Sequence, residues 1–210
     1  MKLKICGMRD PENIRAVGRL APDYMGFIFY PKSPRYIGEM PPPDFRTLTR
    51  GIKRVGVFVD EEMAVVKERI RDFDLHMVQL HGKEPVEYCR KLGQDKPGLE
   101  LIKVFSIGDT FAWDQIAPYL EVVDFVLFDT KGKYPGGNGV TFDWQLLETL
   151  PKEVPYFLSG GLDVHHVKAV VNAGLKPYAL DVNSRFESAP GIKDVDKVRQ
   201  LTQLLSNSKF

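Results

Sequence analysis

Several features are scarce in this sequence, and each absence excludes a class of protein. The 210 residues hold 29 Lys and Arg against 28 Asp and Glu, so the formal net charge is only +1. A protein that binds nucleic acid by neutralising phosphates normally carries a basic excess or a basic stripe, and neither is present. No apolar run approaches the ~18 residues that cross a bilayer as a helix. The start, MKLKICGMRD, lacks the apolar region of a secretory signal. We therefore expect neither nucleic acid nor membrane as a partner.

Cysteine is scarce as well, with Cys6 and Cys89 as the only two. Two cysteines are too few for a disulfide framework in a chain of this length, so we expect free thiols and a cytoplasmic protein. The apolar content of 43% and the charged content of 27% are typical of a globular domain and exclude a disordered chain. No shift in composition marks a linker, which predicts a single domain over residues 1–210.

What the sequence does contain is one pattern, repeated along its whole length. Eight short apolar runs recur about every 25 residues, the size of a compact strand–helix unit. Their apolar character is nearly continuous, as in parallel strands covered by helices on the outside. The predicted strands are residues 3–6, 24–29, 54–59, 77–81, 100–105, 125–129, 155–159 and 178–182.

The segments between these runs show helical spacing and helix start signals. Asp10-Pro11 offers an N-cap followed by proline at the first helical position, and Asp60, Asp163 and Asp194 precede similar apolar repeats. A short proline-capped helix is expected over 41–50, and weaker ones over 109–120 and 142–150. Eight strands alternating with helices predict an α/β fold, a (β/α)8 TIM barrel. The alternative is an open doubly wound sheet, but Cys6-Gly7-Met8-Arg9 after the first strand lacks the G-x-G-x-x-G fingerprint of that fold.

In such a barrel the chemistry lies where strands end and the following loops begin. The first strand ends at Cys6, whose thiol is either a base or nucleophile with a lowered pKa, or a small buried core residue. The loop after the second strand, stiffened by two prolines, presents Arg35. This arginine is either a bidentate ligand for a carboxylate or phosphate, or a solvated loop residue. Cys89 lies in a helical stretch and is expected to pack in the core.

The fourth and sixth strands end in further polar residues. Alternation places Gln79 and His81 on one side of the fourth strand, where the histidine either positions a substrate or is a satisfied core residue. Asp129, after four apolar residues, is a candidate acid or base. Its other reading is an N-cap, but residues 131–139 (KGKYPGGNG) resemble a loop more than a helix start.

The last two strands end in small residues that allow backbone N–H groups to approach an anion. Gly160 and Gly161 follow the seventh strand, and Asn183 and Ser184 follow the eighth. These are the loops that most often bind phosphate in barrels. His165 and His166 are adjacent and would point apart on a helix, and no other cluster has metal-ligand spacing, so we expect no metal. Signatures of a Ser/His/Asp nucleophile or a P-loop are also missing.

Taken together, the motifs resemble the phosphoribosylanthranilate isomerase family over the whole chain. They occur in order at every predicted strand end except the fifth. The matching segments are KICGM (4–8), KSPRY (32–36), VGVFVD (55–60), QLHG (79–82), FDT (128–130), GGNGVTFDW (136–144), FLSGGL (157–162) and ALDVNS (179–184).

The resemblance implies a cofactor-free Amadori rearrangement in tryptophan biosynthesis, acting on a small phosphorylated substrate. N-(5′-phosphoribosyl)anthranilate would become 1-(2-carboxyphenylamino)-1-deoxyribulose 5-phosphate, with Asp129 as general acid and Cys6 as general base. The resemblance further implies that Arg35 binds the anthranilate carboxylate and that His81 lines the substrate pocket. The phosphate would bind at the glycines and polar residues of the last two loops, and the loop at 136–139 would close over the site. The implied binding residues in these segments are Gly136, Gly137, Gly160, Gly161, Asn183 and Ser184.

Two departures and two alternatives remain open at this stage. The family often has DVSSGVE where this chain has DVNSRFE, so Arg185 could add a positive charge to the phosphate site or constrain its loop; Asn138 replaces a frequent threonine.

Another phosphosugar barrel enzyme would share the phosphate loops. An indole-glycerol-phosphate synthase should show catalytic lysines at strand ends, which this sequence lacks, and the histidine-pathway isomerase an aspartate in place of Cys6. The other alternative is a barrel that binds without catalysis. Either a monomer or a homodimer is expected.

Overall fold

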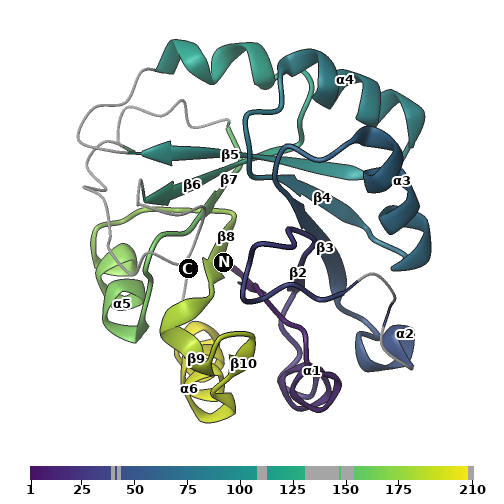
Figure 1. Cartoon of the computed structure of the whole chain (residues 1–210). Coiled ribbons are helices and arrows are strands. Elements are labelled where there is room, and N and C mark those ends of the chain that lie inside the picture. Colours follow the sequence, from purple (N-terminus) through teal and green to yellow (C-terminus); the bar gives the residue numbers. More distant parts are fainter. Residues whose placement is uncertain (39–40, 42–43, 108–112, 131–146, 148–153, 208–210) are drawn as a thin grey trace.

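A closed barrel of eight parallel strands forms the centre of the molecule (Figure 1). The computed structural model describes residues 1–38, 41, 44–107, 113–130, 147 and 154–207. Each strand pairs in parallel with the next along the chain, and β8 pairs with β1 to close the circle. The strands are β1 (Lys2–Ile5), β2 (Tyr24–Ile28), β3 (Lys53–Phe58), β4 (Met77–Leu80), β5 (Glu100–Ile107), β6 (Phe125–Thr130), β7 (Tyr156–Leu158) and β8 (Ala179–Val182). The predicted (β/α)8 barrel is confirmed.

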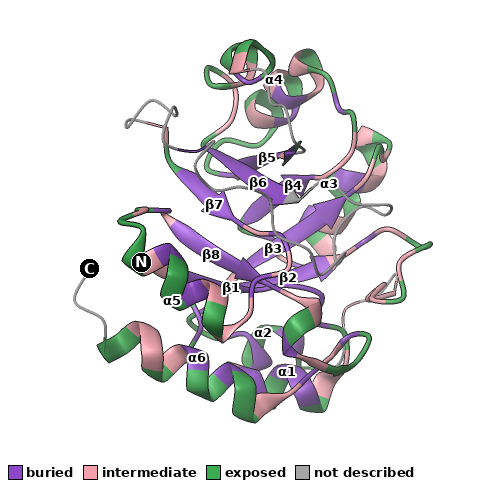
Figure 2. Ribbon diagram, turned by 90° about the vertical axis from the view of Figure 1, so that its left-hand side faces the viewer, coloured by how far each residue is buried: buried purple, intermediate pink, exposed green. Residues whose placement is uncertain are grey.

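The helices surround the barrel with one side against the strands and the other toward solvent (Figure 2). They are α1 (Pro11–Gly18), α2 (Phe45–Leu48), α3 (Met63–Asp72), α4 (Val86–Asp95), α5 (Val164–Asn172) and α6 (Val195–Asn207). After β8 the chain adds a turn of 3-10 helix, η4 (Ser184–Phe186), and an antiparallel hairpin of β9 (Glu187–Ala189) and β10 (Ile192–Lys193) before α6. This hairpin was not predicted, and it contributes to the site described below.

Local signals explain where two of the helices begin. The Asp10 carboxylate accepts a hydrogen bond from the Asn13 N–H at 2.8 Å, and Pro11 occupies the first turn of α1. Asp163 accepts from the N–H groups of His165 and His166 at the start of α5. Both are the side-chain caps expected from the sequence.

Two of the predicted helices differ from the structure. α3 begins at Met63 after Glu62, and Asp60 lies in the left-handed region (φ 49°) instead of capping it. In the described part of the segment 109–120, the chain forms two short 3-10 turns, η1 (Trp113–Gln115) and η2 (Ala117–Tyr119), rather than an α-helix. Pro118 explains this, because a proline inside an α-helix removes a hydrogen bond and clashes with the preceding turn. The helix expected over 142–150 falls, apart from residue 147, outside the described residues.

Strand alternation divides the apolar residues into two cores. One lies between strands and helices and contains outward-facing residues such as Leu3, Ile5 and Leu80. The other fills the barrel interior with inward-facing Tyr24, Val55, Met77, Leu127 and Phe157, among others. The interior is therefore packed, and the open space lies beyond it, at the strand ends.

The N-terminal end of the barrel is closed by aromatic rings and lysine side chains. Phe157 is fully buried and contacts the rings of Tyr24, Phe125 and Tyr178 at centroid distances of 5.5, 5.3 and 5.8 Å. Lys2 Nζ donates to the Tyr178 hydroxyl at 2.9 Å and lies 4.8 Å from the centre of that ring. These contacts form a packed plug of side chains inside the barrel at this end.

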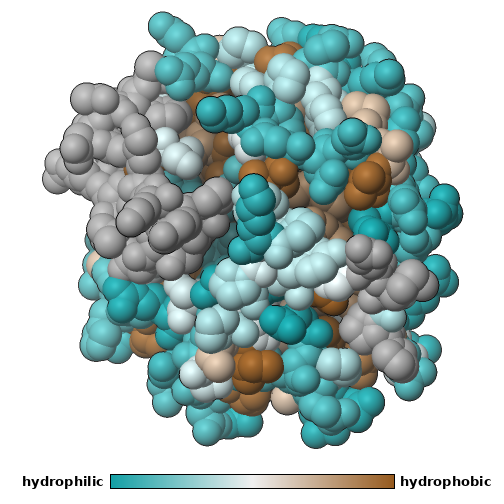
Figure 3. Space-filling view, viewed as in Figure 1, coloured by the Kyte–Doolittle hydropathy of each residue, from teal (hydrophilic) through white to brown (hydrophobic). Residues whose placement is uncertain are grey.

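The face of the molecule seen in Figure 3 is mostly hydrophilic, with smaller apolar areas between the hydrophilic residues. None of the helices in the described ranges is long and apolar enough to cross a membrane.

Candidate active site

A pocket opens at the C-terminal end of the barrel, where the sequence places the candidate residues. Cys6 follows β1, His81 follows β4, Asp129 lies near the end of β6, and Asn183 follows β8. All four line this one pocket. Its other lining residues are Ile28, Tyr30, Ser33, Val57, Val59, Gln79, Ser159 and Asp181. The inward positions at successive strand ends thus converge, as expected from period-two alternation in parallel strands.

Cys6 lies beside a buried ion pair inside the barrel. Lys4 Nζ donates to Asp181 Oδ1 at 2.9 Å, and the two side chains are 0% and 5% exposed. A Cβ atom added at Gly26 would lie 2.7 Å from Cys6 Sγ and 3.1 Å from Lys4 Nζ, so the thiol and the ammonium sit over the same point of β2. The side chains of Lys4 and Cys6 point the same way because they are two residues apart on one strand.

The ionisation of Cys6 follows from these neighbours. Burial raises the pKa of the Cys6 thiol above its ordinary value, and the nearby Asp181 carboxylate adds to this. The charges of Lys4 and Lys193 act in the opposite direction, because a cation favours the thiolate. Burial also raises the pKa of Asp181, against the attraction of Lys4. The charge of Lys4 is therefore the main local support for a Cys6 anion.

Asp129 is linked to His81 and Gln79 across the pocket. Gln79 Nε2 lies 3.0 Å from His81 Nδ1, and His81 Nε2 lies 3.5 Å from Asp129 Oδ2. If the Gln79 amide donates to Nδ1, the neutral histidine carries its proton on Nε2 and directs it at the Asp129 carboxylate. Gln79 Oε1 is buried and has no hydrogen-bond partner among the described residues. The sequence correctly placed Gln79 and His81 on the same inward side.

A second, smaller pocket adjoins the first on the side of β7 and β8. Gly160, Gly161, Asn183, Ser184 and Arg185 line it, together with Asp129, Ser159, Leu162 and Asp181. Gly160 and Gly161 have φ values of 96° and 65°, a backbone conformation that strongly favours glycine. The four predicted phosphate residues of these loops, together with Arg185, therefore share one hollow next to Asp129. Gly136, Gly137 and Asn138 lie outside the described residues.

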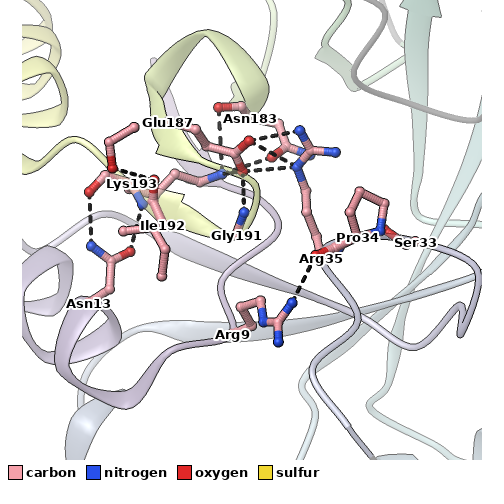
Figure 4. A network of polar contacts seen from close by, with 11 residues as sticks. Arg9, Asn13, Ser33, Pro34, Arg35, Asn183, Glu187, Gly191, Ile192 and Lys193 are labelled. Carbon is pink, nitrogen blue, oxygen red and sulfur yellow. Dashed lines mark hydrogen bonds and ion pairs between the residues drawn. The ribbon is translucent and has the colours of Figure 1, made fainter.

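Arg35 is not among the residues that line either pocket; it lies beside Asn183, which lines both, and belongs to a network of ion pairs (Figure 4). Its guanidinium binds the Glu187 carboxylate, and Lys193 binds the same carboxylate from the other side. The Arg35 side chain is only 14% exposed, so the interpretation as a solvated loop arginine is wrong.

Comparison with known proteins decides the family. The profile described as "N-(5'phosphoribosyl)anthranilate (PRA) isomerase" matches residues 3–204. An N-(5'-phosphoribosyl)anthranilate isomerase from Phocaeicola vulgatus is 42% identical over 195 residues, which cover 92% of each chain. The chain belongs to the phosphoribosylanthranilate isomerase family.

Solved phosphoribosylanthranilate isomerase structures have the same fold as this chain. Monomers generated from the dimeric enzyme of Thermotoga maritima are 32% identical, with a TM-score of 0.83, and the match covers 99% of this chain and 100% of that one. Another such isomerase, solved with reduced 1-(o-carboxyphenylamino)-1-deoxyribulose 5-phosphate, is 31% identical with a TM-score of 0.83 and the same coverage. The family resemblance inferred from the motifs is confirmed.

Within this family fold, sequence reasoning missed several charged residues around the pocket. Lys4 and Asp181 lie inside quoted motifs but received no role, and Glu187 and Lys193 were not singled out. Lys103, in β5, is also buried and pairs with Glu84 at 2.9 Å. A charged residue within an otherwise apolar strand was the available signal, because such a residue is rarely buried without a partner.

Among the described residues, no group of three or more His, Cys, Asp or Glu side chains is placed to hold a metal ion. Cys89 is fully buried in the core between α4 and the strands, as expected from its helical position.

Proposed function

We propose that this protein is a phosphoribosylanthranilate isomerase of tryptophan biosynthesis. The observation that carries the proposal is the convergence of Cys6 and Asp129 on one pocket, next to a glycine-lined hollow. An acid and a base on separate strands, with an anion site beside them, suit an aldose–ketose rearrangement of a phosphorylated sugar. The substrate would be N-(5′-phosphoribosyl)anthranilate.

In the first step, Asp129 acts as the general acid. Its carboxylic acid proton passes to the ribose ring oxygen, the bond from that oxygen to C1 breaks, and the anthranilate nitrogen donates its lone pair to form an iminium. His81, 3.5 Å from Asp129 through Nε2, is suited to orient this carboxyl group and to line the pocket. Asp129 must be protonated when the substrate binds, and it regains a proton from the bound substrate or from solvent after the step.

In the second step, Cys6 acts as the general base. The thiolate removes the C2 proton, the C–H electrons form a C1–C2 double bond, and the iminium nitrogen recovers its lone pair. The resulting enolamine tautomerises to the ketone, with a proton delivered to C1. Carbon 1 is reduced and carbon 2 is oxidised within one molecule, so the reaction is an intramolecular oxidation–reduction. The iminium accepts the electrons, and the proposed sequence uses no cofactor or metal.

The remaining residues are proposed to bind the substrate. Gly160, Gly161, Asn183 and Ser184 would surround the phosphate, supported by their shared hollow and by the usual phosphate site of barrels. Arg35 would bind the anthranilate carboxylate. Gly136 and Gly137 retain the role implied by the family motif. We further propose a single domain over residues 1–210. We also predict that the protein is a monomer or a homodimer and that it is cytoplasmic.

The test is turnover of phosphoribosylanthranilate by the purified protein, followed through the loss of anthranilate-type fluorescence. We expect substrate to be consumed at a rate proportional to enzyme, in buffer with a chelator and without added cofactor. Turnover no faster than the buffer blank contradicts the proposal. Binding of the reduced product analogue without turnover would instead favour a barrel that binds without catalysis.

A further inference from the structure

The guanidinium of Arg35 is already held along one of its edges. Nε donates to both oxygens of Glu187 at 2.9 and 3.1 Å, and Nη2 donates to Oε2 at 2.7 Å. This is the bidentate, side-on arrangement of an arginine with a carboxylate. Among the described residues, no acceptor takes a proton from Nη1. Within the described residues, the other edge of the fork, formed by Nη1 and the second proton of Nη2, therefore keeps hydrogen-bond donors for another planar anion.

Lys193 leaves the cluster with a surplus positive charge. Its Nζ donates to Glu187 Oε1 at 2.6 Å and to Asn183 Oδ1 at 2.8 Å, and its side chain is fully buried. Burial alone would raise the pKa of Glu187, but the hydrogen bonds and charges of Arg35 and Lys193 hold that pKa below its ordinary value. Burial lowers the pKa of Lys193, and the charge and hydrogen bond of Glu187 oppose this. With the Arg35 and Lys193 side chains both protonated, two cations and one anion sum to one positive charge. An Arg35–Glu187 pair without Lys193 would be neutral and would attract a second carboxylate only weakly.

The backbone around Glu187 and Lys193 is fixed from two directions. The Asn13 side chain in α1 accepts from the Lys193 N–H at 2.8 Å and donates to the Lys193 carbonyl at 2.9 Å. The Gly191 N–H donates to Glu187 Oε1 at 3.1 Å within the hairpin. Figure 4 shows Arg35 reaching from the loop after β2 toward Glu187 of the β9–β10 hairpin. The carboxylate that holds Arg35 is thus held in place itself.

The cluster also touches the catalytic strand end. A Cβ atom added at Gly7 would lie 2.8 Å from Arg35 Cδ and 2.7 Å from Asn183 Oδ1, so both side chains pack directly on the residue after Cys6. Gly7 has φ 75° and allows this close approach. Asn183, which Lys193 holds, lines the same pocket as Cys6. A ligand bound at the Nη1–Nη2 edge of Arg35 would therefore lie close to the general base.

We propose that Glu187 and Lys193 are positioning residues for the aromatic end of the substrate. Glu187 occupies the side edge of Arg35 and so presents the Nη1–Nη2 edge to the anthranilate carboxylate, while Lys193 supplies the net positive charge. This inference rests on the proposed function, because it takes the ring carboxylate as the ligand of Arg35. Holding the guanidinium before the substrate arrives avoids the loss of rotamer entropy on binding, which is worth roughly tenfold in affinity.

The test compares two ligands that differ by one group. They are 1-(2-carboxyphenylamino)-1-deoxyribitol 5-phosphate and its phenylamino counterpart without the carboxylate. We expect E187Q to weaken binding of the first ligand about tenfold and to change the second by less than about twofold. E187Q also leaves one more positive charge in the cluster, and we expect the loss of the fixed guanidinium orientation to outweigh that attraction. K193M should act in the same direction, because it removes the surplus charge. A purely structural role for Glu187 would weaken both ligands equally.

The matched control is E100Q, which removes a glutamate from an ion pair with Lys53, 2.5 Å away at the opposite end of the barrel. It should leave the affinities for both ligands unchanged. In an R35A background, E187Q should have no further effect on the carboxylated ligand. If E187Q does not fold, E187D provides the same test, since it keeps the charge but withdraws the carboxylate by one methylene.

Failure of the positioning role can be distinguished from failure of the proposed function. If wild-type protein turns over phosphoribosylanthranilate but E187Q affects both ligands equally, or neither, the positioning role is overturned and the proposed function stands. If the wild type binds neither ligand and shows no turnover, the proposed function fails as well.

Discussion

The two ends of this barrel are built from the same strands but use their inward side chains differently. At the N-terminal end, Tyr24, Phe125, Phe157 and Tyr178 pack ring against ring and fill the interior. At the C-terminal end, the inward positions carry ionisable groups around a pocket, and Cys6, Asp129 and Asp181 are each at most 5% exposed. The first end gains free energy from burying apolar area, whereas the second holds buried charges in pairs.

We therefore expect the stabilising contacts and the proposed chemistry to lie at opposite ends of the strands. In β1, Lys2 contacts Tyr178 at the plug, Lys4 pairs with Asp181, and Cys6 lies just beyond the end of the strand in the pocket. The three share one side of the strand and lie progressively nearer to the pocket. A substitution at one end should therefore change stability with little effect on activity, and at the other end the reverse.

The largest effect is expected from C6S, a substitution in the pocket at the C-terminal end of the barrel. A hydroxyl is a much weaker acid than a thiol and does not ionise near neutral pH, so C6S should lower kcat by about 10²–10⁴-fold. The thermal unfolding midpoint should move by no more than a few degrees, because the two side chains are nearly the same size. Fluorescence-monitored turnover and circular dichroism measure the two quantities.

Cys89 provides the matched control for this substitution. It is the other buried thiol, lies in α4 and packs in the outer core. C89S should cost stability without a comparable loss of kcat. Equal losses of kcat in the two variants would argue against a special role for Cys6.

F157A tests the plug and should give the next largest effect. Removing a fully buried ring in contact with three others should cost about 3–5 kcal/mol of unfolding free energy. Below the unfolding transition, kcat/KM should stay within about twofold of wild type, because the ring lies in the packed interior rather than in the pocket. Urea denaturation and low-temperature kinetics are the measurements. A large loss of kcat in folded F157A would show that the two ends are coupled.

The pH dependence of activity should show how the charges around Cys6 affect its ionisation. A general base is active when deprotonated, and burial raises the pKa of Cys6, so kcat/KM should rise with pH through and beyond the neutral range. Lys4 lowers that pKa, so K4M should move the rising limb to higher pH and reduce activity at neutral pH.

Asp181 limits the structural damage that K4M would cause. Burial already raises the pKa of its carboxyl group, and without Lys4 the neutral form becomes more favourable still. The charge lost with Lys4 is thus partly offset by uptake of a proton. If kcat/KM rises with pH over the same range in K4M as in wild type, Cys6 is not the group whose deprotonation causes the rise.

Much of this division could be predicted from the sequence, because it depends on local periodicity. The spacing of apolar runs gave the strand count, and the alternation in Gln79-Leu80-His81 indicated which side chains face inward. The charged pairs could not be predicted in this way. Lys4 and Asp181 are 177 residues apart, and Arg35 and Glu187 are 152 apart, so only closure of the barrel and the hairpin after β8 bring them together. A charged residue in an apolar strand indicates that a partner exists if the residue is buried, but it does not identify that partner.

The smallest predicted effect, from Y178F, separates the two kinds of stabilisation within the plug itself. The ring would remain packed on Phe125 and Phe157, but Lys2 Nζ would lose its 2.9 Å hydrogen-bond acceptor. A hydrogen bond at a partly buried site contributes about 0.5–1.5 kcal/mol, well below the cost of removing a buried ring. Burial raises the pKa of Tyr178, but the hydrogen bond and the charge of Lys2 lower it. The contact between Lys2 and Tyr178 is therefore partly electrostatic, and its contribution to stability should fall with added salt. Unfolding free energies of wild type and Y178F at low and high salt measure this. A loss as large as that of F157A would mean that the plug depends on its polar groups rather than on its rings, and the contrast between the two ends of the barrel would then fail.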